Sequence, residues 1–417
     1  MAFSTLTFLP PLPPAIEPTT LFAGLLLAGL LGGELAHKLK LPRLLGWILT
    51  GLLLGQVGPQ LSPRLSLEPL LGETRLFFDI AVGLILFDLG RRLDLSWLQR
   101  DRALLAASLL ESGLAFAAMA GVLSLFNFTP LEAGLAAGIG LSTSPAVVLL
   151  VVREARAEGQ VTERCLALVA INTLLAFLTA TTLLSVAHTE HNAPWRTALL
   201  HPLYLLLGSL LLGALAARLV LWGARLLGKG PDAKFAQFIL LAGMLLAAVG
   251  LAHALHLSVF LALLVFGLAS RQWDHRYALL SVDLGGAAQL FYIVLFVLTG
   301  ASLPLSAVAA AGVPAFAYVA ARGLGKAAGV MLTVPFSRIG WRQHGWLSLA
   351  LLPMSGMAIA LVHDLTSLYP QFGERLGNLV LAAVVLLELL GPLAVHVALH
   401  RAGEARPEER AEGGSHA

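Results

Sequence analysis

Residues 141–148 read Leu-Ser-Thr-Ser-Pro-Ala-Val-Val and interrupt an apolar segment at 131–152. Pro145 lacks a backbone N–H and clashes with the preceding turn, so a continuous helix is disfavoured here. A second interruption, Pro353-Met354-Ser355-Gly356, lies in the apolar segment 346–363. At membrane depth, non-helical backbone persists only where it lines a cavity or is buried in protein. The two interruptions therefore predict two discontinuous helices placed inside the protein.

The composition of the chain indicates a membrane protein. Of its 417 residues, 58% are hydrophobic and 12% are charged, and the mean hydropathy is +0.83. Soluble domains carry about 25% charged residues. A membrane-spanning helix needs roughly 20 mostly apolar residues, so the chain has room for about a dozen. We expect an all-α polytopic membrane protein, which excludes a soluble enzyme, a nucleic-acid binder and a single-pass receptor.

We predict thirteen transmembrane helices. The apolar segments are 21–36, 44–57, 75–90, 103–126, 131–152, 165–187, 200–224, 236–254, 257–270, 280–300, 307–335, 346–363 and 376–400. Segments 44–57 and 257–270 are short, so they need flanking residues, tilt or a thinner bilayer to cross.

The distribution of basic residues predicts the orientation. With the N-terminus outside, 20 of the 27 Lys and Arg residues fall in segments facing the cytoplasm and 4 in segments facing outward. Short cytoplasmic loops collect such residues. We therefore expect a multi-pass protein of the cell inner (plasma) membrane, with residues 1–20 extracytoplasmic and a cytoplasmic tail at 401–417.

The two interruptions occur in the fifth and twelfth predicted helices. An offset of seven helices reverses the orientation of one relative to the other, as an inverted repeat requires. Transporters bind substrate at the midplane between such paired broken helices. Alternatively, the two interruptions are simple proline kinks with no role in transport, which are common in membrane helices. We expect the two broken helices to cross near the middle of the bilayer.

Three ionisable residues lie deep in predicted helices: Glu111, Lys326 and Glu388. Ionisable groups in hydrocarbon are costly and are candidates for function by default. A structural salt bridge between helices is the alternative. Because a lone ammonium at this depth must be paired, solvated or deprotonated, we expect Lys326 close to Glu111, Glu388 or the Asn172 amide.

Several stretches together resemble a known family. They are Leu41-Pro42-Arg43-Leu44-Leu45-Gly46-Trp47 running to Gly51 and Gly55; Gly83-Leu84-Ile85-Leu86-Phe87-Asp88-Leu89-Gly90 followed by Leu93-Asp94; Leu141-Ser142-Thr143-Ser144-Pro145-Ala146-Val147-Val148; Arg322-Gly323-Leu324-Gly325-Lys326; and Glu388-Leu389-Leu390-Gly391-Pro392 followed by Ala402-Gly403-Glu404. In order and spacing they resemble the sodium/proton exchanger superfamily, in its bacterial cation:proton antiporter branch, which also contains glutathione-gated potassium-efflux systems. The resemblance covers about residues 20–405.

The resemblance implies an inverted-repeat antiporter fold with two crossed discontinuous helices, in a homodimer. It places ion-carrying core helices at about 103–187 and 307–400, and dimerisation or scaffold helices at about 21–90 and 200–300, within a transporter domain at 21–400. The partners it implies are a monovalent cation, Na⁺ or K⁺, and protons, besides the lipid bilayer. It places Thr143, Ser144 and Ser355 at the broken helices, beside the ion.

Two positions depart from the family pattern. The sixth helix of the family usually carries an acidic pair such as Asp-Asp or Asn-Asp, whereas this chain has Asn172-Thr173. In the twelfth, Ser355-Gly356-Met357 replaces a common Gly-Glu. Asn and Thr oxygens can coordinate a cation but cannot exchange a proton. Asn172 and Thr173 have an alternative interpretation as a pair that hydrogen-bonds two helices together.

An antiporter needs a group that alternately holds a cation and a proton. We predict that Glu111, where relatives often have Gln, replaces the missing acid, with Glu388 as the second candidate. The alternatives are a transporter of an anion or small solute without cation/proton exchange, favoured by Lys326 and Arg322, and a non-transporting homologue.

We expect no enzyme activity, cofactor or nucleic-acid partner. No HExxH, P-loop or GxGxxG motif occurs in a suitable context. The single cysteine, Cys165, excludes an intrachain disulfide and a cysteine-based metal site. His253 and His256, spaced i, i+3 near an outer end, could bind a metal, but two histidines alone make a weak site and a hydrated loop is the preferred interpretation. We expect no metal beyond the transported cation.

Overall fold

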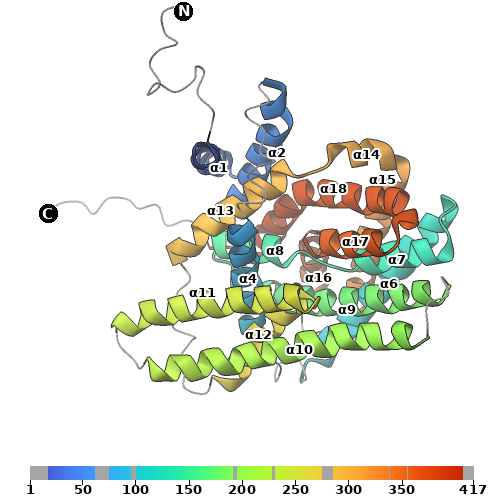
Figure 1. The fold of residues 1–417 in the computed structure, drawn as a ribbon. Helices are drawn as coiled ribbons and strands as arrows, with labels where there is room; N and C mark the ends of the chain where they lie inside the picture. The colour runs from blue at the N-terminus through green and yellow to red at the C-terminus, as the bar shows by residue number, and fades with distance from the viewer. Residues whose placement is uncertain are drawn as a thin grey trace, which may run out of the picture. The chain divides into compact units, whose positions relative to one another are not determined.

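A computed structural model of the chain is all-helical in the residues that it describes (Figure 1), which are 17–61, 75–93, 95, 100–190, 195–227, 231–274, 285–337, 339–354 and 356–406. The helices are α1 (Pro18–Lys38), α2 (Arg43–Leu61), α4 (Arg75–Arg92), α6 (Arg102–Leu125), α7 (Pro130–Gly140), α8 (Pro145–Glu154), α9 (Gln160–Glu190), α10 (Trp195–Leu226), α11 (Pro231–Ala254), α12 (Val259–Trp273), α13 (Gly285–Ala301), α14 (Leu305–Ala311), α15 (Val313–Leu332), the 3₁₀ turn η2 (Val334–Phe336), α16 (Trp341–Ala350), α17 (Gly356–Leu368) and α18 (Pro370–Ala402). They form two compact units, Met1–Phe78 with Gln289–Leu303, and Asp79–Ala288 with Pro304–Ala417.

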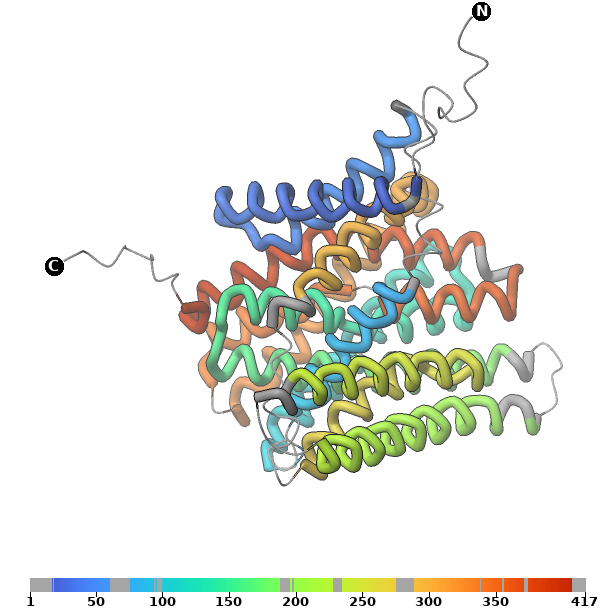
Figure 2. Tube along the Cα trace, turned by 60° about the vertical axis from the view of Figure 1, so that its left-hand side comes forward, coloured from blue at the N-terminus to red at the C-terminus, as the bar shows by residue number. Residues whose placement is uncertain are grey.

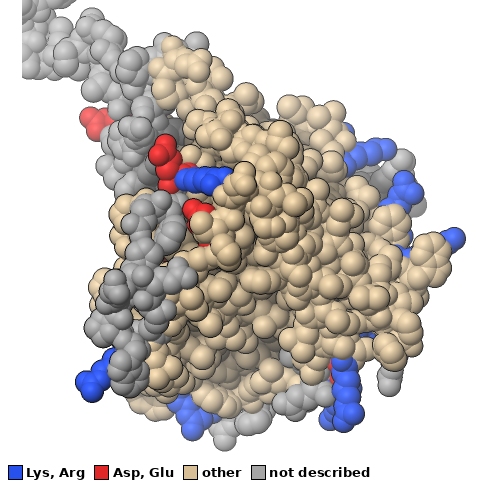
Figure 3. Space-filling view, turned by 90° about the vertical axis from the view of Figure 1, so that its right-hand side faces the viewer, with Lys and Arg blue, Asp and Glu red and all other residues tan. Residues whose placement is uncertain are grey.

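Many of these helices are suited to a bilayer. Seven helical spans in the described part of the chain are long and apolar enough to cross a membrane, or eight if one bent pair counts as a span. The predicted number of thirteen therefore stays a prediction. Large apolar side chains repeat along the exposed side of α10 about every four residues: Leu199, Leu203, Leu207, Leu211, Leu215, Leu219, Trp222 and Leu226. The surface in Figure 3 is likewise mostly uncharged, as contact with lipid requires.

In the first unit, small residues let helices approach closely. Gly29 of α1 faces the Val297 and Ile293 side chains of α13, and Gly51 of α2 faces the backbone at Val297 and Ala301. Helix pairs in membranes gain their stability from this kind of close van der Waals packing.

The second unit contains both broken helices. Pro145 begins α8, and the preceding Ser144 caps that helix by accepting a hydrogen bond from the Val147 N–H at 3.3 Å. Helices α16 and α17 are separated in the same way by the segment 351–355. The Ser144 N–H donates to the Pro353 carbonyl at 3.0 Å, so the two breaks meet as the sequence predicts. Within Pro130–Glu154, 94% of the residues of an apolar 18-residue stretch are buried. The corresponding share is 39% in α6 and in Leu199–Leu226 of α10. The first broken helix is thus an inner element of the unit.

The other helices of this unit pack against one another in pairs. Figures 1 and 2 show α10 and α11 side by side, and α10 also packs on α9 and α12. Helices α6 and α15 pack closely against each other along much of their length. Gly325 and Gly329 of α15 lie against the backbone of α6 at Ala115 and Glu111. Because a side chain at either glycine would overlap that backbone, glycine sets the separation of α6 and α15 beside Glu111 and Lys326.

Replacing Gly329 by valine should separate α6 from α15. Overpacking costs about 1–3 kcal/mol, so the protein purified in detergent should unfold at a lower temperature. Gly113→Ala is the matched control because a Cβ there meets no atom within 4 Å. Equal unfolding temperatures for Gly329→Val and wild type would contradict the account of this helix pair.

Candidate functional site

The crossing of the broken helices leaves backbone carbonyls inside the protein, and one side chain binds four of them. The buried Arg322 guanidinium of α15 donates from Nε to the Gly140 carbonyl at 2.7 Å and from Nη1 to that of Leu352 at 2.6 Å. Its Nη2 donates to the carbonyls of Ser142 at 2.7 Å and Pro353 at 3.4 Å. A helix leaves its last four carbonyls unpaired and carries a partial negative charge at that end. Arg322 therefore neutralises the C-terminal ends of α7 and α16 together.

One turn further along α15, Lys326 forms an ion pair with Glu111 of α6. Both side chains are 0% exposed. The Lys326 ammonium also donates to the Thr143 hydroxyl oxygen at 3.2 Å and the Leu141 carbonyl at 3.3 Å, both in the first break. The pairing of Lys326 with Glu111 that the sequence predicts is therefore present.

Asn172 of α9 joins this cluster. Its Nδ2 donates to Glu111 Oε1 at 2.9 Å and to Thr143 Oγ1 at 3.2 Å. The Ser112 hydroxyl lies within hydrogen-bond distance of Glu111 Oε2, at 2.9 Å, and of the Asn172 amide oxygen, at 3.3 Å. We call Glu111, Ser112, Thr143, Asn172 and Lys326 the polar cluster. It brings α6, α9 and α15 to the first break.

The remaining predicted site residues make no described hydrogen bond to the polar cluster. Thr173 is buried, and its hydroxyl donates to the Val169 carbonyl of its own helix at 2.9 Å. Ser144 caps α8. Glu388 is 1% exposed in α18, but the hydrogen bonds of Lys326 to described residues go to Glu111, Thr143 and Leu141. Ser355 lies outside the described residues.

Two features of the site were missed by sequence reasoning. The contacts of Ser112 were not foreseen, although Ser108, Glu111 and Ser112 follow the i, i+3, i+4 spacing that places them on one side of a helix. Arg322 was noticed as part of a motif, but its hydrogen bonds to carbonyls of both breaks were not. No local pattern reveals these bonds, because they join residues up to 182 positions apart.

The comparison with protein families decides the assignment. Residues 22–400 match the family described as sodium/hydrogen exchanger, transmembrane. The chain belongs to this family. It is also 34% identical over 139 residues to the putative cation/proton antiporter YbaL of Escherichia coli (strain K12), an overlap of 33% of this chain and 24% of that protein.

Solved structures share the fold of this exchanger-family chain. The sodium proton antiporter MjNhaP1 from Methanocaldococcus jannaschii at pH 8 has a TM-score of 0.68 at 18% identity, with 94% of this chain and 99% of that chain covered. A three-dimensional electron microscopy structure of the same antiporter has a TM-score of 0.65 at 18% identity, with 94% and 100% covered. The chain is thus a multi-pass membrane protein with an antiporter fold.

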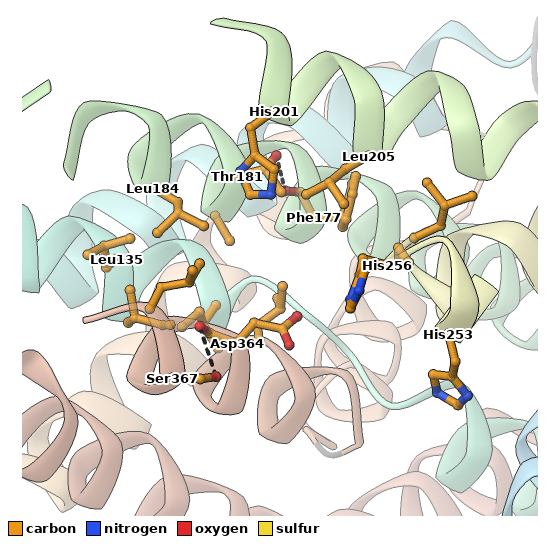
Figure 4. A pocket seen from close by; sticks show the side chains of 17 residues that line it. Leu135, Phe177, Thr181, Leu184, His201, Leu205, His253, His256, Asp364 and Ser367 are labelled. Carbon is orange, nitrogen blue, oxygen red and sulfur yellow. Dashed lines mark hydrogen bonds between the residues drawn. The ribbon is translucent and has the colours of Figure 1, made fainter. Parts of the chain in front are cut away.

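This exchanger-family chain also has a cavity of about 470 Å³ between α7, α9, α10 and α17, bordered by the end of α11 and the turn that follows it. Figure 4 shows His201 of α10 and Asp364 of α17 projecting into it from opposite walls. Ile139 and Phe177 also line the cavity, and they lie about one helical turn from Thr143 and Asn172 in the chain. One border of the cavity thus lies close to the polar cluster.

His253 and His256 border this cavity as well. Within the described ranges, no group of three or more His, Cys, Asp and Glu side chains is placed to hold a metal ion. A metal site at this histidine pair is therefore not proposed.

Replacing Arg322 by methionine should destabilise the protein strongly. Each buried carbonyl left unpaired costs about 1–3 kcal/mol. Of the four that Arg322 binds, the Pro353 carbonyl also accepts from the Ser144 N–H, so removing the guanidinium takes away the bond described for the other three. We expect a large fall in the unfolding temperature in detergent. Arg218→Met, at an exposed arginine of α10, should change stability by only about 0.5 kcal/mol. Similar losses from both variants would contradict the proposed role of Arg322.

Proposed function

We propose that the chain exchanges a monovalent cation, Na⁺ or K⁺, for protons by alternating access, and that the Glu111 carboxylate carries the proton. The observation that carries this proposal is the contact of buried Glu111 with Lys326, Asn172 and Ser112 beside the first break. Membership of the exchanger family and the antiporter fold support the reaction. Buried ionisable groups held by specific partners are where proton-coupled chemistry is expected.

Glu111 is the member of the polar cluster suited to exchange a proton for a metal cation. A carboxylate can bind a proton or a metal cation at the same oxygens, whereas the hydroxyl and amide groups of Ser112, Thr143 and Asn172 do not titrate near neutral pH. The neutral pair Asn172-Thr173 on α9 thus leaves the acid to the neighbouring α6. Asn172 donates to the same oxygen of Glu111 that Lys326 contacts.

Lys326 occupies the position where a cation would bind. Its ammonium contacts Glu111 Oε1, Thr143 Oγ1 and the Leu141 carbonyl, which are oxygen ligands suited to a hard metal cation. A cation bound to these oxygens would displace the ammonium. Competition between Lys326, the cation and a proton for Glu111 couples the fluxes, because two of them cannot use the carboxylate fully at the same time.

The positive groups around the crossing are already engaged by negative or polar partners. Two helix C-terminal ends carry together about one negative charge, which Arg322 offsets, and Glu111 offsets Lys326. The Arg322 donors bind carbonyls and the Lys326 ammonium binds Glu111, so an anion would have to compete for both. At the start of α8, the N–H of Ser144 donates to Pro353 and that of Val147 to Ser144 Oγ. These contacts weigh against the alternative of an anion transporter.

We further propose that the cavity at His201 and Asp364 is the route by which ions reach the polar cluster from outside. It lies at the helix ends that the positive-inside rule assigns to that side. Asp364 is the carboxylate among its lining residues and would attract cations. We also propose that the protein lies in the plasma membrane with its N-terminus outside and its C-terminus in the cytoplasm. Two chains are proposed to form a dimer.

A cysteine at the wall of this cavity should react with a water-soluble thiol reagent added from outside. Ala180→Cys places a thiol on the lining, whereas Ala176→Cys, one turn away on α9, lies at a fully buried position that does not line the cavity. The natural Cys165 is buried and should stay unmodified. We expect labelling and loss of flux for Ala180→Cys alone. Equal reactivity at both positions would count against the route.

Glu111→Gln should reduce cation-dependent proton flux at least tenfold in proteoliposomes, because an amide cannot carry the proton. The assay imposes Na⁺, K⁺ or Li⁺ gradients and follows internal pH. Glu388→Gln is the matched control, since it removes a buried carboxyl of α18. Size-exclusion chromatography checks that each variant stays folded and assembled. Wild-type flux from Glu111→Gln would remove Glu111 as the proton carrier. No flux from the wild type with any of the three cations would overturn the proposed exchange.

A further inference from the structure

The end of α18 contacts a distant part of the same unit. The helix ends at Ala402, and Gly403 adopts a left-handed conformation, with φ of 75°, that reverses the chain direction. The Glu404 N–H then donates to the Leu399 carbonyl at 3.1 Å. This turn directs residues 403–406, which we call the C-terminal strap, onto the loop between α8 and α9.

The Glu404 carboxylate caps the start of α9. Its Oε1 accepts from the Val161 N–H at 2.8 Å, and its Oε2 accepts from the N–H and the hydroxyl of Thr162, each at 2.8 Å. The first N–H groups of a helix have no partner within the helix, and a negative charge is favourable at that end. In most helices the cap is a neighbouring residue. Here it is supplied from more than 240 residues away.

Backbone contacts also hold the strap, at Glu404 itself and at Arg406. The Glu158 N–H donates to the Glu404 carbonyl at 3.0 Å, and the Arg406 N–H donates to the Ala155 carbonyl at 3.1 Å. The Arg406 guanidinium also pairs with the Glu158 carboxylate, although both side chains are largely exposed. Such an exposed pair contributes little. Glu404, by contrast, binds Val161 and Thr162, which are buried at the start of α9. It is therefore the main side-chain anchor of the strap.

The loop that the strap contacts joins α8 and α9, and both helices are connected to residues of the polar cluster. Helix α8 follows the break that contains Thr143, and α9 carries Asn172. Because α9 is continuous from Gln160, its start and Asn172 lie about 18 Å apart on one helix. A shift of α9 along its axis would move Asn172 relative to Glu111 and Thr143, to which it is bonded at 2.9 and 3.2 Å.

We propose that Glu404 is a positioning residue for ion exchange, which holds α9 in the axial position where Asn172 meets Glu111 and Thr143. This inference rests on the proposed function of the polar cluster. The hydrogen bonds described for the Glu404 carboxylate go to Val161 and Thr162 and not to the polar cluster, so its influence acts through α9. It ties the last helix of the chain to the loop that joins α8 and α9.

Other charged groups surround this anchor. Glu163, on the first turn of α9, interacts electrostatically with Glu404, Glu158, Arg92 and Arg271. A variant should therefore remove one acid at a time. Glu158→Gln is the matched control because it removes an acid of the same loop and leaves every bond to the Glu404 carboxylate in place.

The test compares exchange in proteoliposomes for wild type, Glu404→Ala and Glu158→Gln. Glu404→Ala should raise the half-saturating cation concentration by about tenfold and shift the pH profile, as expected for loss of charge-assisted hydrogen bonds. Glu158→Gln should match the wild type. Thr162→Val, which removes one of the three bonds, should give a smaller shift in the same direction.

A double-mutant cycle shows whether the effect passes through α9. In an Asn172→Ala background, Glu404→Ala should leave the half-saturating concentration unchanged. An equal effect in both backgrounds would overturn the inference. So would a fall in unfolding temperature with unchanged half-saturation and pH profile, because that is the result of a purely structural strap. Absence of wild-type exchange would instead overturn the proposed function, and this inference with it.

Discussion

Backbone carbonyls that meet inside an apolar unit need hydrogen-bond donors, and this requirement governs the second unit of the protein. The breaks before Pro145 and Gly356 end α7 and α16 inside the unit. Arg322 supplies donors to both ends at once, which is possible because its planar guanidinium presents several N–H groups in a fixed geometry. The crossing can persist in a membrane because this one side chain replaces the water that the carbonyls would otherwise need.

The arrangement of the remaining charges follows from the same requirement. The helix ends are already paired with Arg322, so the buried Lys326 ammonium needs another negatively charged partner. The close approach of α6 at Gly325 and Gly329 provides Glu111. At this place α9 offers the amide of Asn172. The carboxylate lies on the neighbouring α6 and is linked to the first break through Asn172 and Lys326, which both contact Thr143. Asn172 now orients the acid, which explains why the axial position of α9 would matter.

Local chemistry made much of this predictable from sequence. Pro145 in a polar stretch and the second polar break at 353–356 favour two discontinuous helices, and the cost of burying Lys326 unpaired points to Glu111. Thr173 was grouped with Asn172 because the two are adjacent in sequence, but its hydroxyl bonds to its own helix. The Arg322 contacts and the Glu404 cap were not predictable, because each depends on how helices far apart in sequence approach one another. The same holds for the cavity at Asp364, whose walls come from five helices and a turn.

In the proposed exchange, the Glu111 carboxylate gives up a proton when it binds a cation. Proton release on adding Na⁺ or K⁺ to the purified protein in weakly buffered detergent solution tests it most directly. Matched additions of a large, non-transported cation correct for ionic strength. The account predicts that the transported cation releases protons from wild type and from Glu388→Gln, and none from Glu111→Gln. Undiminished release from Glu111→Gln would contradict it and place the exchanging group elsewhere.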